Sequence, residues 1–198
     1  REIAKPNSEN LHVVLVDIDR FKTVNDGLGH DAGDSLLMVL GRRIEQLLGP
    51  EDTVARLPGD QFAVLFSDSG QTRDIRRFTD SLRQTIAKPV NVNQQEIFMT
   101  ACLGAASLRE GGSTAEQLMK DAAIALYEAK RRGKEMIEFF RSSMRDERGE
   151  LVALEAELRR ALERNEIEVH YQPIARLSDM DLAGFEALVR WRHPSLGL

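Results

Sequence analysis

Three aspartates lie at the ends of strand-like runs, and two of them could share a divalent cation. Asp17 and Asp19 come directly after the apolar run 11–16, which is typical of a buried strand. Because side chains alternate between the faces of a strand, residues two apart emerge on the same side. Farther along, residues 58–61 separate two β-rich runs, which predicts a hairpin with Asp60 at its tip. If the hairpin lies beside the first strand, Asp17 and Asp60 can share a magnesium ion and, through it, the phosphates of a nucleotide.

The surrounding sequence predicts the elements that would position these carboxylates. Strands are expected at residues 11–16, 53–57, 62–66, 88–92, 97–108 and 135–140, and helices at 21–29, 32–48, 72–86 and 114–132. Ser113 or Thr114 can cap the last helix, since a hydroxyl there satisfies a free N–H group, and Gly133 ends it. Strands interleaved with helices predict a layered α/β domain in which helices cover a sheet.

The sequence changes character near Met144, which predicts a first domain over residues 1–143 and a second over 144–198. The second begins with a charged helical stretch whose apolar residues recur at helical spacing: Leu151, Leu154, Leu158 and Leu162. This stripe suits packing on the domain that follows better than a coiled-coil seam. Strands are expected at 169–174 and 182–191, with Tyr171 and Trp191 in the core of that domain.

Composition narrows the function classes. The 198 residues carry a net charge of −5, so they lack the basic field that would capture nucleic acid. Cys102 is the only cysteine, which rules out a disulfide within the chain and favours the cytoplasm. No apolar run is long enough to cross a bilayer. A first residue other than Met and a last residue within a motif predict a segment of a longer polypeptide, which other domains could tether to a membrane.

Two motifs identify a family resemblance. Residues 17–34 read Asp-Ile-Asp-Arg-Phe-Lys-Thr-Val-Asn-Asp-Gly-Leu-Gly-His-Asp-Ala-Gly-Asp, and residues 56–62 read Arg-Leu-Pro-Gly-Asp-Gln-Phe. With residues 125–130, Ala-Leu-Tyr-Glu-Ala-Lys, they resemble the GGDEF family of diguanylate cyclases over residues 11–140. The resemblance implies an α+β sandwich of the nucleotide-cyclase type, with a mixed, largely antiparallel five-stranded sheet flanked by helices. It also implies condensation of two GTP to cyclic di-GMP by a homodimer that uses Mg²⁺ or Mn²⁺.

The resemblance also assigns roles by position. Asp17 and the backbone carbonyl of Ile18 match the family's metal ligands, and Asp60 matches the first acidic residue of its signature turn. Asn25 and Asp34 match the residues that read guanine. An amide and a carboxylate suit the guanine edge, and they reject bases that would leave them unpaired.

Three lysines match the positions that neutralise phosphates. They are Lys22, Lys130 and Lys134, the last standing where the family commonly has arginine, which keeps the charge but loses the fork geometry. The basic residues near Gly133 could instead have a structural role, because positive charge at a helix C-terminus interacts favourably with the helix dipole. Asp19 is also open to a structural role, since the resemblance gives metal binding mainly to Asp17.

The signature turn departs from the family pattern at two positions. Pro58 replaces the first glycine and Gln61 replaces the second acidic residue. A neutral glutamine cannot accept a proton from the attacking hydroxyl or contribute a charged metal ligand, which predicts crippled condensation. Proline has a fixed φ and no N–H, so a displaced or widened turn is expected. The upstream Arg-x-x-Asp product-inhibition motif keeps Asp52 but has Gly49 in place of arginine, which predicts the loss of that inhibition.

The C-terminal residues resemble the opening of a second family. Residues 171–174 and 184–194 are similar to the start of EAL domains, which hydrolyse cyclic di-GMP. Gln172 matches a pocket residue, Glu186 a metal ligand and Arg190 a phosphate contact. They lack the further carboxylates that metal-assisted hydrolysis needs, so this segment alone is not expected to hydrolyse cyclic di-GMP.

The leading hypothesis is a regulatory GGDEF domain that binds GTP with magnesium, turns it over little or not at all, and controls an adjoining EAL phosphodiesterase. One alternative is a slow but active diguanylate cyclase. Another is a dimerisation scaffold without nucleotide, which predicts that Asn25→Ala and Asp34→Ala change nothing in the full-length protein.

Overall fold

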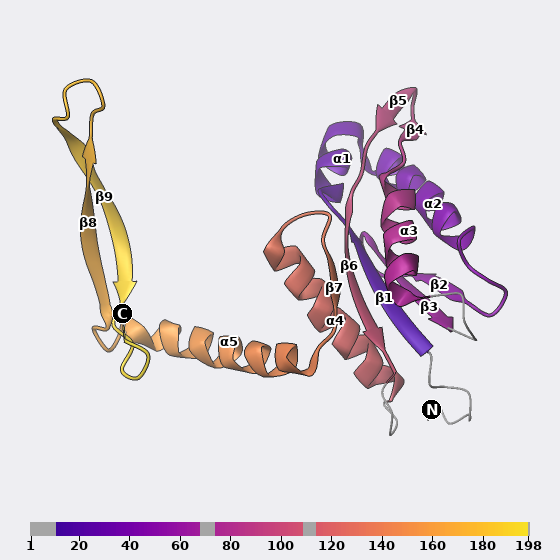
Figure 1. The fold of residues 1–198 in the computed structure, drawn as a ribbon. Helices are drawn as coiled ribbons and strands as arrows, with labels where there is room; N and C mark the ends of the chain where they lie inside the picture. The colour runs from indigo at the N-terminus through magenta and orange to yellow at the C-terminus, as the bar shows by residue number, and fades with distance from the viewer. Residues whose placement is uncertain (1–10, 68–73, 109–113, 198) are drawn as a thin grey trace. The chain divides into compact units, whose positions relative to one another are not determined.

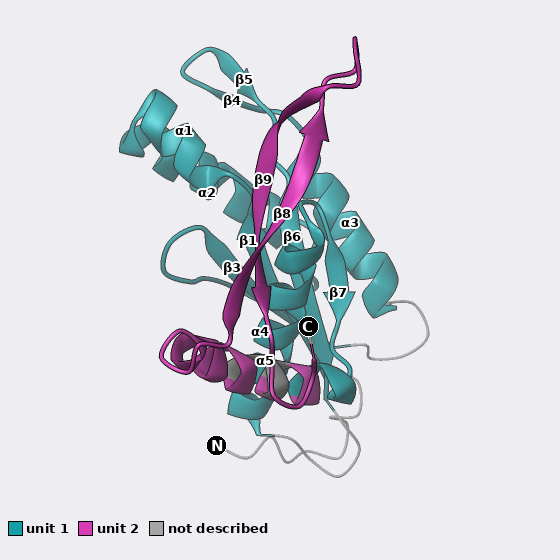
Figure 2. Cartoon of the chain, turned by 90° about the vertical axis from the view of Figure 1, so that its left-hand side faces the viewer, with its two compact units in different colours: residues 1–145 teal, residues 146–198 magenta. Residues whose placement is uncertain are grey.

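The chain forms two compact units, which are described separately. The computed structural model describes residues 11–67, 74–108 and 114–197. The first unit spans residues 1–145 and the second 146–198 (Figure 2). None of the helices among the described residues is long and apolar enough to cross a membrane.

A five-stranded sheet forms the centre of the first unit (Figure 1). Its order is β2 (Thr53–Arg56), β3 (Gln61–Ser67), β1 (Leu11–Ile18), β6 (Ala101–Ser107) and β7 (Ile137–Phe139). The strands pair antiparallel except for β6 and β7, which run parallel. The prediction of a mixed, largely antiparallel sheet is therefore confirmed.

The helices of this unit are α1 (Phe21–Leu28), α2 (His30–Glu45), α3 (Ile75–Ala87) and α4 (Ala115–Arg132). Thr114 caps α4, since its side chain accepts a hydrogen bond from the backbone N–H of Gln117 at 3.1 Å. Gly133 follows as the C-cap residue with a φ of 141°, so the predicted helix end is confirmed.

The single strand predicted over residues 97–108 is wrong. Only its first residue, Ile97, belongs to β5 (Gln95–Ile97), which pairs with β4 (Val90–Val92) in a separate hairpin. Residues 98–100 lie in no strand, and β6 joins the main sheet. Asn93 and Gln94 both adopt positive φ, at 52° and 64°, and form the two-residue turn between β4 and β5. A two-residue turn with positive φ matches the twist of a hairpin. The chain therefore folds back at this turn, and Ile97 pairs with Val90.

The sheet separates two apolar cores. Val14, Val16 and Ile18 of β1 pack in the core that α2 and α3 cover, whereas Val13 and Leu15 pack in the core that α4 covers. Figure 1 shows the sheet between these two layers of helices. Because side chains alternate along a strand, the residue that follows Val13 and Leu15 in this series, Asp17, faces α4.

The helix α4 lies directly on the backbone of β6. A Cβ atom on Gly104 would lie 2.1 Å from the backbone nitrogen of Leu126 and 2.5 Å from the carbonyl oxygen of Ala122. Only glycine permits this approach, which fixes the height of α4 above the sheet. Lys130 is four residues beyond Leu126, on the same side of the helix, and is thereby held near the end of β1.

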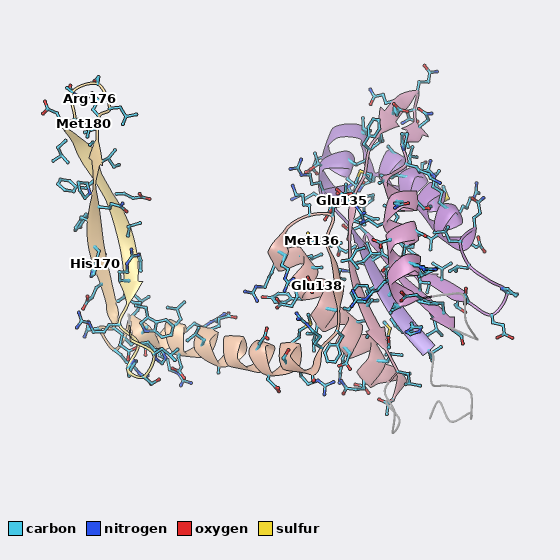
Figure 3. All side chains as sticks on the ribbon, in the orientation of Figure 1. Glu135, Met136, Glu138, His170, Arg176 and Met180 are labelled. Carbon is cyan, nitrogen blue, oxygen red and sulfur yellow. The ribbon has the colours of Figure 1, made fainter. Side chains whose placement is uncertain are left out.

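The second unit consists of most of α5 (Ser142–Ala161) and a hairpin of β8 (Ile167–Ala175) and β9 (Leu182–Trp191). The two strands expected here are therefore present. Figure 3 shows His170 on β8 and Arg176 and Met180 at the turn between the strands.

The core roles expected in the second unit are not met. Tyr171 is 67% exposed, so the prediction that it is a core residue is wrong for this structure. Leu158 and Leu162 of the apolar stripe are 46% and 72% exposed. Trp191 is half-buried, with its indole N–H donating to Glu166 at 3.1 Å. A two-stranded hairpin buries little of either face unless another layer packs on it, which explains the exposure.

Candidate functional site

Asp17 lies at the end of β1 and is held by two donors. Its side chain is buried, and its Oδ2 accepts a hydrogen bond from Gln61 Nε2 at 2.6 Å. The same oxygen forms an ion pair with Lys130 Nζ at 2.5 Å. Gln61 lies directly opposite Asp17 in the β1–β3 register, and Lys130 comes from the last turn of α4. The sheet and the crossover helix thus meet at this carboxylate.

The hairpin between β2 and β3 closes against the same end of β1. The N–H of Leu57 donates to the carbonyl of Gln61 at 2.9 Å, which leaves residues 58–60 at the tip. Gly59 has a φ of 85°, a conformation that glycine adopts without strain. The N–H of Ile18 donates to the carbonyl of Asp60 at 3.2 Å. The turn is therefore wider than a two-residue hairpin, as expected, but it is not displaced from β1.

The carboxyl group of Asp60 faces an electrostatic conflict. Its pKa is raised above the usual 3.8, first because the group is partly buried and second because the negative charge of Asp17 is close. A backbone hydrogen bond and the charge of Lys130 act in the opposite direction. Asp17 and Asp60 are therefore close enough to repel each other, and a cation between them would relieve that repulsion.

The donor set fits a hard divalent ion. Asp17, Asp60 and the carbonyl of Ile18 are all oxygen ligands, which Mg²⁺ and Mn²⁺ prefer. Within the described residues, no group of three or more His, Cys, Asp or Glu side chains is placed to bind a metal. The ion would need water or phosphate oxygens to complete its shell, as magnesium bound by one or two carboxylates usually does.

Metal affinity should fall as the pH is lowered through the raised pKa of Asp60, because the protonated carboxyl cannot bind the ion. We expect the apparent Mg²⁺ affinity to drop about tenfold per pH unit below that pKa, for one proton displaced. The raised pKa also means that the ion-free fold favours protonated Asp60, and this stability is lost as the pH rises through the folded pKa.

Two substitutions test this pH dependence. Asp60→Asn should abolish it and should raise the free energy of unfolding of the ion-free protein at neutral pH. Asp31→Asn, on the exposed first turn of α2, serves as the control for a lost surface charge. Calorimetric Mg²⁺ titrations at several pH values give the measurement. If the Mg²⁺ affinity of the wild type stays the same from neutral pH to below the pKa of Asp60, the assignment of Asp60 as a ligand is contradicted.

The two residues expected to read guanine lie on neighbouring helices. Asn25 is on α1, and its Oδ1 is buried with no hydrogen-bond partner among the described residues. Asp34 is on α2 and exposed, and its Oδ1 pairs with Arg56 Nη2 of β2 at 3.1 Å. The residue types and spacing do not predict this ion pair, which joins Arg56, two residues before Pro58, to Asp34.

The three lysines expected to contact phosphate are not placed alike. Lys130 contacts Asp17, and Lys22 is exposed in the first turn of α1. Lys134 lines a hollow of about 490 Å³ together with Asp19, Arg20 and other residues of α1 and the β5–β6 connection. Asp17, Asp60 and Lys130 do not line this hollow, so the structure groups Lys130 with the carboxylates and Lys134 with a neighbouring surface.

Asp19 has a structural role. Its Oδ2 accepts hydrogen bonds from Thr100 Oγ1 at 2.6 Å and from the N–H of Glu135 at 3.0 Å. Cys102 Sγ lies 3.4 Å from Asp19 Oδ1 and 3.2 Å from the carbonyl oxygen of Gly133, so its one S–H group can donate to either of them. Figure 3 shows Glu135 on the segment between α4 and β7. Asp19 therefore ties the end of β1 to that segment, and Cys102 is a buried thiol whose pKa burial raises.

The three residues predicted for the second domain share one face of the β8–β9 hairpin. Gln172 lies directly opposite Glu186 in the antiparallel register, and Arg190 lies opposite Glu168. Because Glu186 and Arg190 are an even number of residues apart on β9, their side chains emerge on the same side. The structure thus brings Gln172, Glu186 and Arg190 to one face of the hairpin, where Gln172 and Glu186 are exposed and Arg190 is half-buried.

Comparison with known proteins decides the family. The family described as "Diguanylate cyclase, GGDEF domain" matches residues 1–136. The chain belongs to the GGDEF family. A second family model, the EAL domain, matches residues 155–198, so the GGDEF domain is followed by EAL sequence, and the two are domains of cyclic di-GMP signalling.

Two curated relatives of Pseudomonas aeruginosa contain both regions of the chain. The "Cyclic di-GMP phosphodiesterase NbdA" is 38% identical over 197 residues, which are 100% of this chain and 25% of NbdA. The "Bifunctional diguanylate cyclase/cyclic di-GMP phosphodiesterase MucR" is 38% identical over 186 residues, 94% of this chain and 27% of MucR. The chain therefore spans about a quarter of the length of these relatives.

Solved structures confirm the fold of the GGDEF domain. An EAL/GGDEF domain protein from M. capsulatus matches with a TM-score of 0.63 and 34% identity, over 69% of this chain and 88% of that one. The GGDEF domain of TpbB (YfiN) from Pseudomonas aeruginosa matches with a TM-score of 0.65 and 34% identity, over 70% of this chain and 81% of the other.

Two positions at which the sequence predicts a departure from the family pattern make local contacts. At the second acidic position of the signature, the amide of Gln61 donates to Asp17 rather than adding a third carboxylate. At the upstream product-inhibition motif, Asp52 accepts a hydrogen bond from the N–H of Gly49 at 2.7 Å. Asp52 also accepts a hydrogen bond from the N–H of Ser67 at 3.4 Å, so its side chain supports the turn that precedes β2.

Proposed function

We propose that this GGDEF domain binds GTP with Mg²⁺ or Mn²⁺ in the cytoplasm, turns it over little or not at all, and controls the adjoining EAL phosphodiesterase through its occupancy. The observation that carries the proposal is the hydrogen bond from Gln61 to Asp17. The bond engages only Oδ2 of Asp17, so Asp17 and Asp60 can still share an ion. The donor is an amide, which stands where the reaction would need an acidic group.

Each part of the nucleotide has a counterpart among the residues of the site. Asp17, Asp60 and the carbonyl of Ile18 would hold the ion, which when bound would neutralise and bridge phosphate oxygens. Asn25 and Asp34 would read the base. Lys130, with Lys22 and Lys134 reaching from neighbouring surfaces, would neutralise the phosphates.

Two features of the signature turn argue against efficient condensation. The attacking 3′-hydroxyl must lose a proton, and the Gln61 amide cannot accept it. Pro58 offers no N–H to a phosphate oxygen at the tip of the hairpin. Binding tolerates such changes better than catalysis does, because a misplacement of about 1 Å can cost 10²-fold in rate.

A slow diguanylate cyclase is the second candidate. The observation that favours it is that Asp60, in the signature turn, stays beside the end of β1, with its carbonyl accepting from the N–H of Ile18. Such an enzyme would act as a homodimer in which each domain presents one GTP. Chromatography of a GTP incubation separates the candidates: a cyclic di-GMP peak that disappears in Asp60→Ala would replace the binding-only function with this one.

Isothermal titration calorimetry tests the binding claim. We expect saturable heat when GTP is added in the presence of Mg²⁺, and none when a chelator has removed the ion. ATP should bind at least about tenfold more weakly, because it would leave the Asn25 and Asp34 groups unpaired. Absence of heat at millimolar GTP with Mg²⁺ would refute the proposal.

A further inference from the structure

Asn25 and Gly33 make an unusually close contact between α1 and α2. A Cβ atom built on Gly33 would lie 1.9 Å from Asn25 Oδ1 and 3.0 Å from both Asn25 Cγ and the Cζ of Phe21. A separation of 1.9 Å is far inside any van der Waals contact. The Asn25 side chain therefore occupies the space that a methyl group would fill on any other residue at position 33.

The two polar atoms of the Asn25 amide, Oδ1 and Nδ2, have different surroundings. Its Oδ1 is buried against Gly33 and has no hydrogen-bond partner among the described residues. Because the amide is planar, burying one corner against the helix backbone fixes the direction of the opposite corner, away from Gly33. Burying a polar atom without a partner costs free energy, so this arrangement needs a compensating use.

The second reader is positioned independently of the first. Asp34 adjoins Gly33 on α2, and its carboxylate is paired with Arg56 at 3.1 Å. The positions of the two proposed base-reading residues thus have different causes. An ion pair with Arg56 holds Asp34, and the lack of a Cβ on Gly33 makes room for Asn25.

We propose that Gly33 is a positioning residue that determines base specificity: by lacking a Cβ it fixes the Asn25 amide in the orientation that distinguishes guanine from adenine. The inference rests on the proposed GTP site. With Oδ1 buried, the Asn25 amide presents its Nδ2 donor, which can donate to guanine O6, where adenine has an amino group instead. The Asp34 carboxylate can accept from the N–H groups at N1 and N2 of guanine, which adenine lacks, so the pair favours guanine. A methyl group at position 33 would force Asn25 into another rotamer and remove the fixed orientation.

The variant Gly33→Ala tests this inference by calorimetry with Mg²⁺ and either GTP or ATP. We expect GTP affinity to fall about tenfold, the effect of losing a well-placed hydrogen bond, while ATP affinity stays unchanged. Gly27→Ala is the matched control: Gly27 lies in α1, and its added methyl would meet no atom within 4 Å, so it should preserve both affinities.

A double-mutant cycle separates positioning from packing. In an Asn25→Ala background the amide is gone, so Gly33→Ala should produce no further loss of GTP affinity. If α1 and α2 merely pack at Gly33, the variant should lower GTP and ATP affinity equally, and the losses from the two substitutions should add. Either result would overturn the inference while leaving GTP binding by the wild type intact.

The remaining outcomes are also decisive. Wild-type protein that does not bind GTP would overturn the proposed function and this inference together. If Gly33→Ala does not fold, recovery of the circular dichroism spectrum in Asn25→Ala/Gly33→Ala would support the contact, and retention of the GTP preference by Asn25→Ala would overturn the role in specificity.

Discussion

Gln61→Glu is expected to convert GTP to cyclic di-GMP at least about 10²-fold faster than the wild-type protein. General acid–base groups contribute about 10²- to 10⁴-fold to a rate, and glutamate restores one at the position where this chain has an amide. The substitution also removes the hydrogen bond to Asp17 Oδ2 and places a third carboxylate beside Asp17 and Asp60. Cyclic di-GMP formed from GTP and Mg²⁺, separated by chromatography, measures the change.

The same substitution should make the fold depend on the ion. Without a divalent cation, Gln61→Glu adds negative charge next to two carboxylates that already repel each other, so its free energy of unfolding should fall. Mg²⁺ should restore it, because an ion that binds only the folded state stabilises that state. Gln61→Met, which removes the amide donor without adding charge, is the control and should stay inactive. A Gln61→Glu protein as inactive as Gln61→Met would show that Gln61 is not what limits turnover, and would direct attention to Pro58.

Asp17→Asn is expected to weaken Mg²⁺-dependent GTP binding by at least about 100-fold. Replacing even an outer-shell partner of a metal ligand costs about 10- to 100-fold in metal affinity, and Asp17 is assigned as a direct ligand. Asparagine keeps the shape of the side chain and its contact with Gln61, but it removes the charge that binds the ion and pairs with Lys130. Calorimetric titration of GTP with and without Mg²⁺ gives the ratio.

The Asp17→Asn result needs controls for fold and for net charge. Asp31→Asn makes the same chemical change on an exposed turn of α2 and should leave the GTP affinity unchanged. Asp17→Asn leaves Lys130 without its carboxylate partner, but that ammonium is half exposed, so the protein should remain folded. Undiminished Mg²⁺-dependent GTP binding in Asp17→Asn would mean that the ion, if bound, is held elsewhere.

The sequence was sufficient to predict the sheet and to place Asp17 and Asp60 at neighbouring turns. Apart from the buried His12, the run Leu11–Val16 is apolar because both faces of β1 are buried, and such a run indicates a central strand. For the same reason its pattern does not distinguish the two faces. That Asp17 faces α4, and so meets Lys130, depends on the packing of that helix on Gly104.

The contacts that hold Asn25 and Asp34, the two residues proposed to read the base, join elements that are separate in the sequence. Asn25 and Gly33 are eight positions apart and on different helices. Neither their spacing nor their residue types predict that the Asn25 side chain fills the space beside Gly33. The pairing of Arg56 with Asp34 likewise joins β2 to α2. Strands on both sides of the β4–β5 turn were expected, but the break at residues 98–100 that separates β5 from β6 was not, because Phe98 and Thr100 are residue types common in strands.

The position of the only cysteine gives the molecule a built-in chemical reporter. The sulfur of Cys102 touches the side chain of Asp19 and the carbonyl of Gly133, so it lies beneath the segment after β1 and the segment after α4 at once. A thiol with a raised pKa is mostly protonated at neutral pH and reacts slowly with alkylating reagents. Reagent must also wait for these two segments to separate. The rate at which Cys102 is alkylated therefore reports how often the two segments separate. A nucleotide that contacts both segments would lower that rate.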